Sequence, residues 1–472
     1  MNIPKNSINV IKDRKKIIFN PQLGLLGTDI NSMNHYEHTN DLYGEIEEPG
    51  MDREIQGFTF VLTTKCNLNC KYCYSITQNE PLSMKKDEPA KILSYYLRND
   101  ADVIIVHFFG GEPTLEMETI KNTVDYLKSI KNKTIYLRIS TNGFVKKEDL
   151  DYLIDNNFLI AVSNDGLPHK KSMLAKRKGG DIVENTIKYL VSRKALFNIR
   201  CTVTKDNLES LAESVSYWKS IGIEHAHVEP YHPIGLDDET ELLPDIETYI
   251  LSFKKMLDVA EKERLWISSG IYMNLLTPST YFCTGASGRF KVFNPDGSIT
   301  TCYRVQSFKN KIKDFYIGNW KEKTSNNLKI DNYRFNHKKL LCHSIYSMES
   351  CEKCEYSLLC GGGCLMRNLT QGGNITKHDK WICSLKKRLI KDAIIRTWEA
   401  ISKNNLPIVL GRFVFEYKAF NTPSLGMLKK LQIQDFKYKH SVENVVDLYQ
   451  VLDINRNIEH TEYKKIARAE CI

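Results

Sequence analysis

The 472-residue sequence contains no long apolar run. Its start, Met1 to Lys5 and then the charged stretch Lys12–Lys16, has no apolar segment of signal-peptide length, and no later run approaches a membrane span. We therefore expect a cytoplasmic protein with no membrane partner. Extreme composition is also absent, because 42% hydrophobic and 26% charged residues are ordinary for a globular chain. This excludes wholesale disorder and a collagen-like fold.

The basic residues do not form a nucleic-acid-binding pattern. The net charge is +9, from 66 Lys and Arg against 57 Asp and Glu, with denser stretches at Lys12–Lys16 and His169–Lys178. The second stretch has no interleaved Phe, Tyr or Trp, which a surface that stacks on bases would need. The charge is compatible with an acidic peptide as partner, and a nucleic-acid partner is not favoured.

Cysteine is what the sequence has in excess, with 13 residues. In a reducing cytosol, clustered cysteines are metal ligands or catalytic groups more often than disulfides. Their positions relative to the predicted strands and helices therefore matter for function.

From Phe58 to Pro230, short β-branched or aromatic runs alternate with amphipathic stretches, which is typical of βα units. Strands are predicted at Phe58–Leu62, Val103–Phe109, Thr134–Ile139, Phe158–Ser163, Asn198–Thr204 and Glu224–Glu229. Helices are predicted near Glu88–Arg98, Thr114–Ile130, Lys147–Asn156, Asp181–Leu196 and Asn207–Ile221. Six such units form an open parallel sheet or a barrel, with the ligand site at the carboxyl ends of the strands.

The rest of the chain is less regular. A further helix is expected near Asp245–Glu263, and Thr277 to Cys383 is rich in Cys, Gly and Asn. Before residue 57 only Lys16–Phe19 reads as a strand, and after Arg396 only Val442–Leu452 reads as a helix. We expect an N-terminal extension at 1–56, a barrel domain at 57–265, a cysteine-organised domain at 270–390 and a C-terminal extension of unknown role at 391–472.

Cys66, Cys70 and Cys73 form a CxxxCxxC motif directly after the first predicted strand of the barrel. Three thiolates at this spacing can hold three irons of a cubane cluster and leave the fourth iron for another ligand. The alternatives are a zinc site that lacks one ligand, or three unrelated thiols.

With Tyr72 before the last cysteine, the motif resembles the signature of radical S-adenosylmethionine (SAM) enzymes, and the resemblance covers Phe58 to about Pro230. It implies an α/β fold, a partial (β/α)6 barrel, in which the unique iron binds SAM. Gly110, Gly111 and Glu112 follow the second strand, where the family receives the amino group of SAM. The resemblance further implies SAM contacts from Tyr72, Ser140, Asn142, Ser163 and Arg200.

A second set contains seven cysteines. They are Cys283, Cys302, Cys351, Cys354, Cys360, Cys364 and Cys383. The run from Cys351 to Cys364 alone reads as a zinc ribbon, which is the structural alternative. The complete set, with thirteen residues between Cys283 and Gly297 and four between Gly297 and Cys302, resembles the SPASM domain of radical SAM enzymes.

The SPASM resemblance implies two auxiliary [4Fe–4S] clusters. Cluster I would take Cys283, Cys302 and Cys364, and cluster II would take Cys351, Cys354, Cys360 and Cys383. Two cubanes need eight ligands and seven are present. Relatives with full ligation have a cysteine at the position of Thr277, so cluster I either has an open iron or takes Cys342. Cys201 and Cys471 are expected to be bystanders.

The resemblance implies three [4Fe–4S] clusters, SAM and an electron donor such as flavodoxin or ferredoxin. We expect an oxidoreductase, a maturase of ribosomally made peptides, that abstracts hydrogen from a peptide or protein and forms a thioether or carbon–carbon crosslink. The related alternative is an anaerobic sulfatase-maturing enzyme, from whose pattern Tyr74-Ser75 and Tyr303 depart. A non-catalytic iron–sulfur or zinc-stabilised protein is the second alternative. Residues 1–56 are either a truncated leader-peptide-binding element or a plain extension.

Overall fold

The computed structural model describes residues 7–12, 15–20, 25–28, 55–75, 81–167, 180–233, 239–272, 279–287, 290–306, 312–322, 340, 344–403, 405, 407–410 and 445–447. The chain divides into two compact units that interleave along the sequence. Unit 1 contains Met1–Glu48, Ile246–Cys283 and Ser344–Cys471; unit 2 contains Pro49–Asp245, Thr284–His343 and Ile472. The predicted domain boundaries stay predictions.

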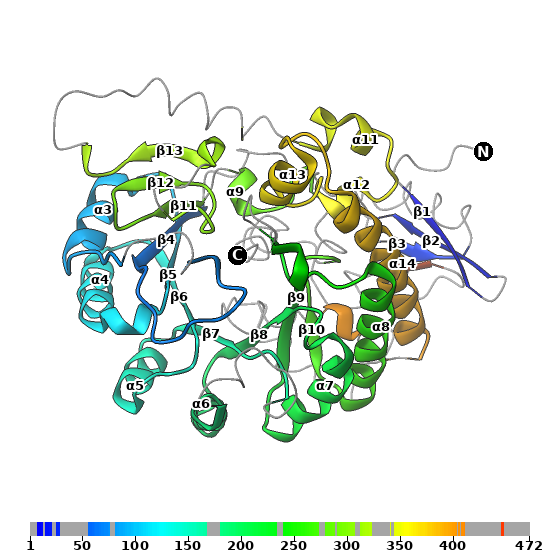
Figure 1. Cartoon of the computed structure of the whole chain (residues 1–472), viewed down its shortest axis with the longest axis horizontal. Helices are drawn as coiled ribbons and strands as arrows, with labels where there is room; N and C mark the ends of the chain where they lie inside the picture. Colours follow the sequence, from blue (N-terminus) through cyan, green and yellow to red (C-terminus); the bar gives the residue numbers. More distant parts are fainter. Residues whose placement is uncertain are drawn as a thin grey trace. The chain divides into compact units, whose positions relative to one another are not determined.

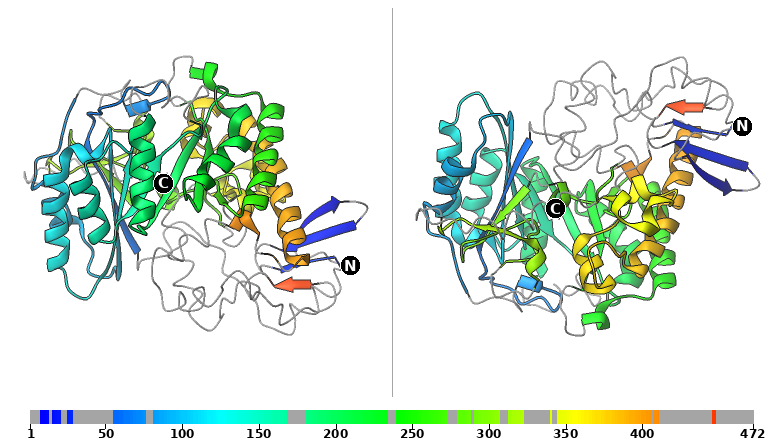
Figure 2. Two further views of the ribbon diagram at one scale, coloured as in Figure 1. Left: turned by 90° about the horizontal axis from the view of Figure 1, so that it is seen from below. Right: turned by 90° about the horizontal axis from the view of Figure 1, so that it is seen from above.

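Unit 2 is built on a parallel sheet that contains all six predicted barrel strands (Figure 1). In spatial order they are β4 (Ile55–Thr63), β5 (Val103–Gly110), β6 (Thr134–Thr141), β7 (Leu159–Ser163), β8 (Phe197–Val203) and β9 (His225–Pro230). The intervening helices are α3 (Glu88–Tyr96), α4 (Met117–Ser129), α5 (Lys147–Asp155), α6 (Gly180–Ser192) and α7 (Leu211–Ser220). They lie along the outer side of the sheet (Figures 1 and 2), which confirms the partial (β/α)6 barrel.

The two faces of this sheet differ in chemistry because side chains alternate along a strand. Apolar residues such as Phe108 and Val162 are buried under the helices. The opposite face carries polar side chains, among them His107, Ser140 and Arg200. Charged and polar groups inside a barrel must be paired or bind a ligand, so this face is the expected ligand-binding surface.

Three further strands extend the sheet of unit 2 beyond β4. They are β11 (Phe290–Phe293), which is parallel to β4, and the antiparallel strands β12 (Ser298–Thr300) and β13 (Tyr316–Asn319). Cys302 follows β12, so one predicted cluster ligand belongs to the sheet that carries the CxxxCxxC loop.

Unit 1 contains a second sheet, in the order β1 (Ile8–Lys12), β2 (Lys15–Asn20), β3 (Leu25–Gly27) and β14 (Val445–Asp447), with antiparallel neighbours. The sequence predicted only Lys16–Phe19 as strand in this N-terminal region. The predicted helix at Val442–Leu452 is wrong at Val445–Asp447, which pairs with β3 instead. Pairing with a distant strand overrides the local helical periodicity there.

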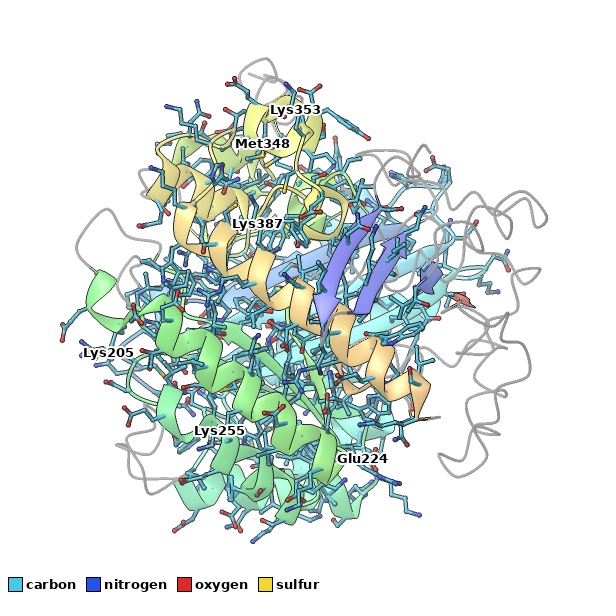
Figure 3. The ribbon with its side chains drawn as sticks, turned by 90° about the vertical axis from the view of Figure 1, so that its right-hand side faces the viewer. Lys205, Glu224, Lys255, Met348, Lys353 and Lys387 are labelled. Atoms are coloured by element: carbon cyan, nitrogen blue, oxygen red, sulfur yellow. The ribbon has the colours of Figure 1, made fainter. Side chains whose placement is uncertain are left out.

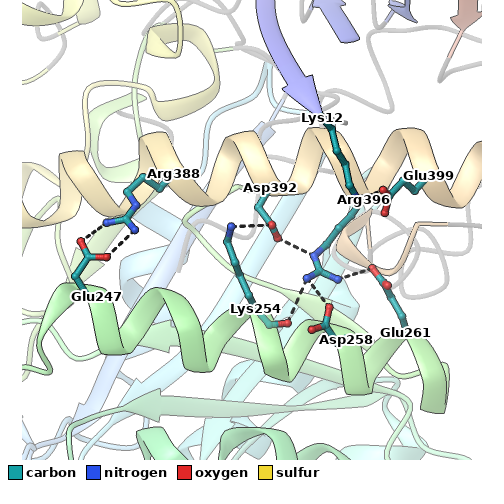
Figure 4. Close-up of polar contacts among 9 residues, drawn as sticks. All are labelled: Lys12, Glu247, Lys254, Asp258, Glu261, Arg388, Asp392, Arg396 and Glu399. Carbon is teal, nitrogen blue, oxygen red and sulfur yellow. Dashed lines mark hydrogen bonds and ion pairs between the residues drawn. The ribbon is translucent and has the colours of Figure 1, made fainter. Parts of the chain in front are cut away.

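Two long helices run side by side in unit 1, α8 (Ile246–Glu263) and α14 (Lys380–Ser402) (Figure 4). Arg396 of α14 donates to Asp258 at 2.7 Å and to Glu261 at 3.0 Å, both on α8. Lys12 at the end of β1 forms an ion pair with Glu399 of α14. The helix α14 was not predicted as one element, although Asp379 caps its start.

The smaller elements of unit 1 carry most of the second cysteine set. They are α11 (Glu349–Glu352), α12 (Ser357–Cys360) and α13 (Leu365–Gly372). Among the residues that the structure describes, no helix is long and apolar enough to cross a membrane. Thr277, Cys342, Cys471 and the basic stretch His169–Lys178 lie outside the described residues.

Candidate functional site

The CxxxCxxC loop follows β4 at the carboxyl end of the parallel sheet. Cys66, Cys70 and Cys73 are half-buried cysteines that are not joined in a disulfide. The backbone turns so that Cys73 N–H donates to Cys70 O at 3.0 Å, and Leu68 N–H points at Cys66 Sγ at 3.3 Å. Burial raises the pKa of the Cys66 thiol, although the hydrogen bond from Leu68 opposes the rise. Iron binding would have to displace the thiol protons.

The Gly110-Gly111 pair lets the end of β5 touch the start of this loop. Gly111 N–H donates to Thr63 O at 2.7 Å, and Glu112 N–H donates to Lys65 O at 2.9 Å. A Cβ at Gly111 would stand 2.1 Å from Lys65 O, and one at Gly110 would stand 2.3 Å from Thr63 O. Gly110 also has a φ of +150°. Only glycine fits this backbone contact.

Glu112 is completely buried, and its carboxylate accepts four hydrogen bonds. Thr114 donates through N–H at 3.1 Å and through Oγ1 at 2.7 Å, Thr141 Oγ1 donates at 2.9 Å and Asn142 N–H donates at 2.7 Å. Burial raises the pKa of Glu112, and these hydrogen bonds counteract the rise. The carboxylate is thereby fixed beside the carboxyl end of β6.

Asn142 joins Glu112 to the cysteine loop. Besides its backbone contact with Glu112, its Nδ2 lies 3.5 Å from Cys66 Sγ and donates to Asn67 Oδ1 at 2.7 Å. Hydrogen bonds to cluster sulfurs are among the factors that set the potential of an iron–sulfur cluster. The structure thus brings three predicted parts together: the cysteine motif, the Gly-Gly-Glu motif and Asn142.

Tyr72 has a partner that the sequence did not single out. Its hydroxyl donates to Asp165 Oδ2 at 2.6 Å, and Thr202 N–H donates to Asp165 Oδ1 at 3.1 Å. Asp165 is buried, which raises its pKa to about 6. Burial, the Asp165 charge and the nearby Cys70 raise the pKa of Tyr72 well above its usual value. Asp165 could have been found from the sequence, because the hydroxyl of the motif tyrosine needs a hydrogen-bond acceptor and Asp165 follows a predicted strand.

The other predicted SAM contacts lie on the polar face of neighbouring strands. Ser140 Oγ is hydrogen-bonded to His107 Nε2 at 2.9 Å, and Ser163 is the register partner of Arg200. On the same strand as Arg200, Asn198 Oδ1 is buried without a hydrogen-bond partner among the described residues. A polar ligand such as SAM fits a face with half-buried hydroxyl and guanidinium groups and an unsatisfied buried oxygen.

A histidine–glutamate cluster at the end of β9 was also missed. His227 Nε2 lies 3.0 Å from Glu229 Oε1, and His232 Nε2 lies 4.0 Å from Glu229 Oε2. Burial alone would raise the pKa of Glu229, but the two imidazoles outweigh it and hold this pKa well below the usual value. The alternation of His227 and Glu229 along a strand was the available signal.

The segment after Cys73 packs on the segment after Cys302. Ser75 Oγ donates to Gln306 Oε1 at 2.6 Å in a buried contact. The rings of Tyr74 and Tyr303 are 6.4 Å apart, and the Tyr303 ring meets Phe109 edge-on at 5.0 Å. These contacts fix Cys302 relative to the cysteine loop within unit 2.

In unit 1, the four predicted ligands of cluster II lie close to one another. Burial raises the pKa of Cys351 to about 11, and the thiols of Cys360, Cys354 and Cys383 add to the rise. The thiols of Cys354 and Cys383 have raised pKa values from burial and from the same Cys360 neighbour. Four mutually close, half-buried thiols fit a cubane, in which each thiolate binds its own iron.

The described residues contain no group of three or more His, Cys, Asp or Glu side chains that could hold a metal ion as they stand. Of the predicted ligands of cluster I, Cys283 and Cys364 belong to unit 1 and Cys302 to unit 2, so this ligand set stays a prediction. Cys201 is buried among the apolar residues of β8, as a small hydrophobic side chain would be.

Comparisons with known proteins agree with this geometry. Residues 60–217 match the Radical SAM superfamily. The radical SAM cyclopropyl synthase TigE of Paramaledivibacter caminithermalis is 24% identical over 419 residues, which is 82% of this chain and 82% of TigE. An uncharacterized protein of Methanocaldococcus jannaschii is 29% identical over 269 residues, 53% of this chain and 89% of that protein.

Solved structures share the fold. Native anSMEcpe with bound AdoMet has a TM-score of 0.61 at 20% identity and covers 74% of this chain and 99% of its own. Streptococcus suis SuiB bound to precursor peptide SuiA has a TM-score of 0.52 at 17% identity and covers 75% of this chain and 80% of its own. The region that matches the Radical SAM superfamily is the partial barrel of unit 2, from β4 to α7. A match to this family implies a [4Fe–4S] cluster and SAM.

Proposed function

We propose that this chain is a radical SAM/SPASM maturase that abstracts hydrogen from a peptide or protein and forms a thioether or carbon–carbon crosslink. The observation that carries the proposal is the combination of two cysteine sites. One is the Cys66 loop, joined to Glu112 and Asn142 by hydrogen bonds, and the other is the four-cysteine group around Cys360. A radical SAM enzyme without auxiliary clusters would not need the second group.

When bound, a [4Fe–4S] cluster and SAM supply the radical that takes a hydrogen atom from the substrate. Cys66, Cys70 and Cys73 would hold that cluster. Glu112, whose position is fixed by four donors, would receive the amino group of SAM, and Asn142 holds the cysteine loop against it. These residues therefore position the cofactor, and the chemistry requires that position to be held closely.

The remaining polar residues of the barrel would position SAM and the substrate. Ser140, Ser163 and Arg200 lie on one face of the sheet, and Tyr72 is held by Asp165. An arginine there suits a carboxylate, which it can bind through two parallel hydrogen bonds. The buried apolar face and the helices outside it exclude water from this side of the barrel, as radical chemistry requires.

A peptide substrate is supported by the neighbours. SuiB was solved with its precursor peptide, anSMEcpe was solved with bound peptides, and TigE is named as a cyclopropyl synthase. We infer that Cys351, Cys354, Cys360 and Cys383 hold auxiliary cluster II, and that Cys283, Cys302 and Cys364 hold cluster I with an open iron or with Cys342. An electron donor such as flavodoxin or ferredoxin would reduce the SAM-binding cluster.

The position after Cys302 argues against the sulfatase-maturing alternative. Tyr303 stands where that branch has an aspartate base, and its ring packs against Phe109 and Tyr74. An aromatic side chain in this packing offers no carboxylate to the substrate. We therefore favour crosslink formation over oxidation of a cysteine or serine to formylglycine.

The test uses anaerobically reconstituted full-length chain and a short peptide encoded beside its gene. We expect the peptide to lose two hydrogen atoms by mass spectrometry, with one equivalent of 5′-deoxyadenosine formed per crosslink. The matched control replaces Cys351 and Cys354 with Ala, which removes cluster II ligands and leaves the SAM-binding motif intact. A product that carries an aldehyde instead of a crosslink would contradict the proposal and support sulfatase maturation.

A further inference from the structure

Lys386 is a buried lysine in the centre of the cysteine-rich part of unit 1. It lies on α14 three residues after Cys383, so both side chains share one side of the helix. Lys386 is only 2% exposed, whereas Lys387 and Lys391 on the same helix are exposed. Lysine is almost never fully buried unless its charge is paired.

The ammonium group of Lys386 has two described contacts, and neither is a carboxylate. Its Nζ donates to Cys360 O at 3.3 Å and stands 4.0 Å from the centre of the Phe282 ring. Among the residues that the structure describes, no ion pair of Lys386 with Asp or Glu is present. The cation therefore contacts Cys360, a predicted ligand of cluster II, and Phe282, the residue before the predicted cluster I ligand Cys283.

The backbone next to Cys360, whose carbonyl accepts from Lys386, is closely packed. A Cβ on Gly361, the residue after Cys360, would stand 2.3 Å from Tyr281 O and 2.7 Å from Phe282 N. The segment before Cys283 thus lies directly on the Cys360–Gly361 turn. A buried charge without a counter-charge is strongly unfavourable, and a carbonyl with an aromatic face offsets only part of that cost.

An iron–sulfur cluster bound by the cysteines around Lys386 would provide a negative charge close to its ammonium group. Four thiolates from Cys351, Cys354, Cys360 and Cys383 give a cubane a net negative charge, and net charge is one of the factors that set its potential. We propose that Lys386 is a positioning residue whose buried ammonium compensates the charge of auxiliary cluster II and raises its reduction potential. This inference rests on the proposed function, because it requires that cluster II exists.

The sign of the effect follows from the charges. Reduction adds one negative charge to the cluster, and a nearby cation stabilises the reduced form more than the oxidised form. Because Lys386 is buried, salt screens its effect little. Exposed Lys387 opposes part of the rise in the pKa of Cys383, but its effect on the cluster will be screened by solvent and salt. Figure 3 labels Lys387 on α14.

The experiment is an EPR-monitored redox titration of reconstituted full-length chain. All variants carry Ala at Cys66, Cys70 and Cys73, so that only auxiliary clusters contribute signals. Replacement of Cys351 and Cys354 with Ala then assigns the signal of cluster II. For K386M we expect at least a tenfold fall in the equilibrium constant for one-electron reduction, which corresponds to a potential about 59 mV more negative.

Three further variants act as controls. K386R keeps the charge, so its equilibrium constant for one-electron reduction should lie within about threefold of the parent value. K391M should leave the potential unchanged, and any shift in K387M should disappear at about 1 M salt, where the screening length is about 3 Å. An unchanged potential in K386M with full iron content would overturn the proposal.

Measurement of the iron content keeps the proposal testable if K386M does not bind cluster II. Loss of cluster II in K386M and K386Q with normal loading of K386R supports charge compensation, whereas loss in all three overturns it. Failure of the proposed function looks different, because the parent protein itself would then contain no auxiliary cluster signal. The two failures are therefore distinguishable in one set of samples.

Discussion

Replacement of Asp165 by Asn should remove a pH-dependent loss of stability. Burial raises the pKa of Asp165 from 3.8 to about 6, a difference of about 2.2 units. At about 1.36 kcal/mol per unit, the ionised form costs the folded protein about 3 kcal/mol. Because the pKa of Asp165 is higher in the folded than in the unfolded protein, the folded protein loses stability as the pH rises from about 4 to 6. The loss persists above pH 6.

The assay compares unfolding of the cluster-free protein and D165N from pH 4 to pH 7. An amide keeps an oxygen for Thr202 N–H and offers its N–H to the Tyr72 oxygen, so the contact geometry survives. We expect the free energy of unfolding of the parent protein to fall by about 2 kcal/mol relative to D165N over this range, because the unfolded carboxyl is already more than half ionised at pH 4. D125N, at an exposed carboxylate on α4, is the control. Parallel pH profiles for the parent and D165N would refute the reasoning.

Three other substitutions test single contacts. Gly111→Ala places a Cβ 2.1 Å from Lys65 O, so it should destabilise the protein by at least about 1–3 kcal/mol in thermal unfolding and remove the iron of the Cys66 site in iron analysis. Gly373→Ala is the control: its φ of +78° strains an alanine, but nothing lies within 4 Å, so it should lower stability and keep the iron. Glu112→Gln replaces one accepting oxygen with an NH2 group that faces hydrogen-bond donors. This variant should have a free energy of unfolding lower by about 1–3 kcal/mol and should not bind SAM in equilibrium dialysis. Arg396→Met breaks contacts with three carboxylates at 11% side-chain exposure and should destabilise by about 2–3 kcal/mol in chemical unfolding, whereas Arg388→Met, at 44% exposure, should cost about 0–1 kcal/mol.

The barrel was predictable because its strands are short β-branched runs and its helices are amphipathic. Each of the six predicted strands overlaps an observed strand, and the site loops follow at their carboxyl ends. The Gly-Gly-Glu motif was also predictable by position. The reason why glycine is required at position 111 was not predictable, because Lys65 O and Gly111 belong to segments that are 46 residues apart in the sequence.

Other features depend on pairing that local sequence does not encode. The N-terminal sheet includes Val445–Asp447, which lies more than 400 residues after the strand it pairs with. Asp165 stood in a turn-like Ser-Asn-Asp-Gly segment, and only the fold brings it to Tyr72. Lys386 reads as one of many lysines until its helix is packed against Cys360 and Phe282.

Reductive cleavage of SAM is the most direct test of the central claim. Anaerobically reconstituted protein, reduced with dithionite, should form 5′-deoxyadenosine and contain about twelve irons, whereas the variant with Ala at Cys66, Cys70 and Cys73 should form none and keep about eight. Formation of 5′-deoxyadenosine by that variant, or zinc with negligible iron in the parent protein, would contradict the account.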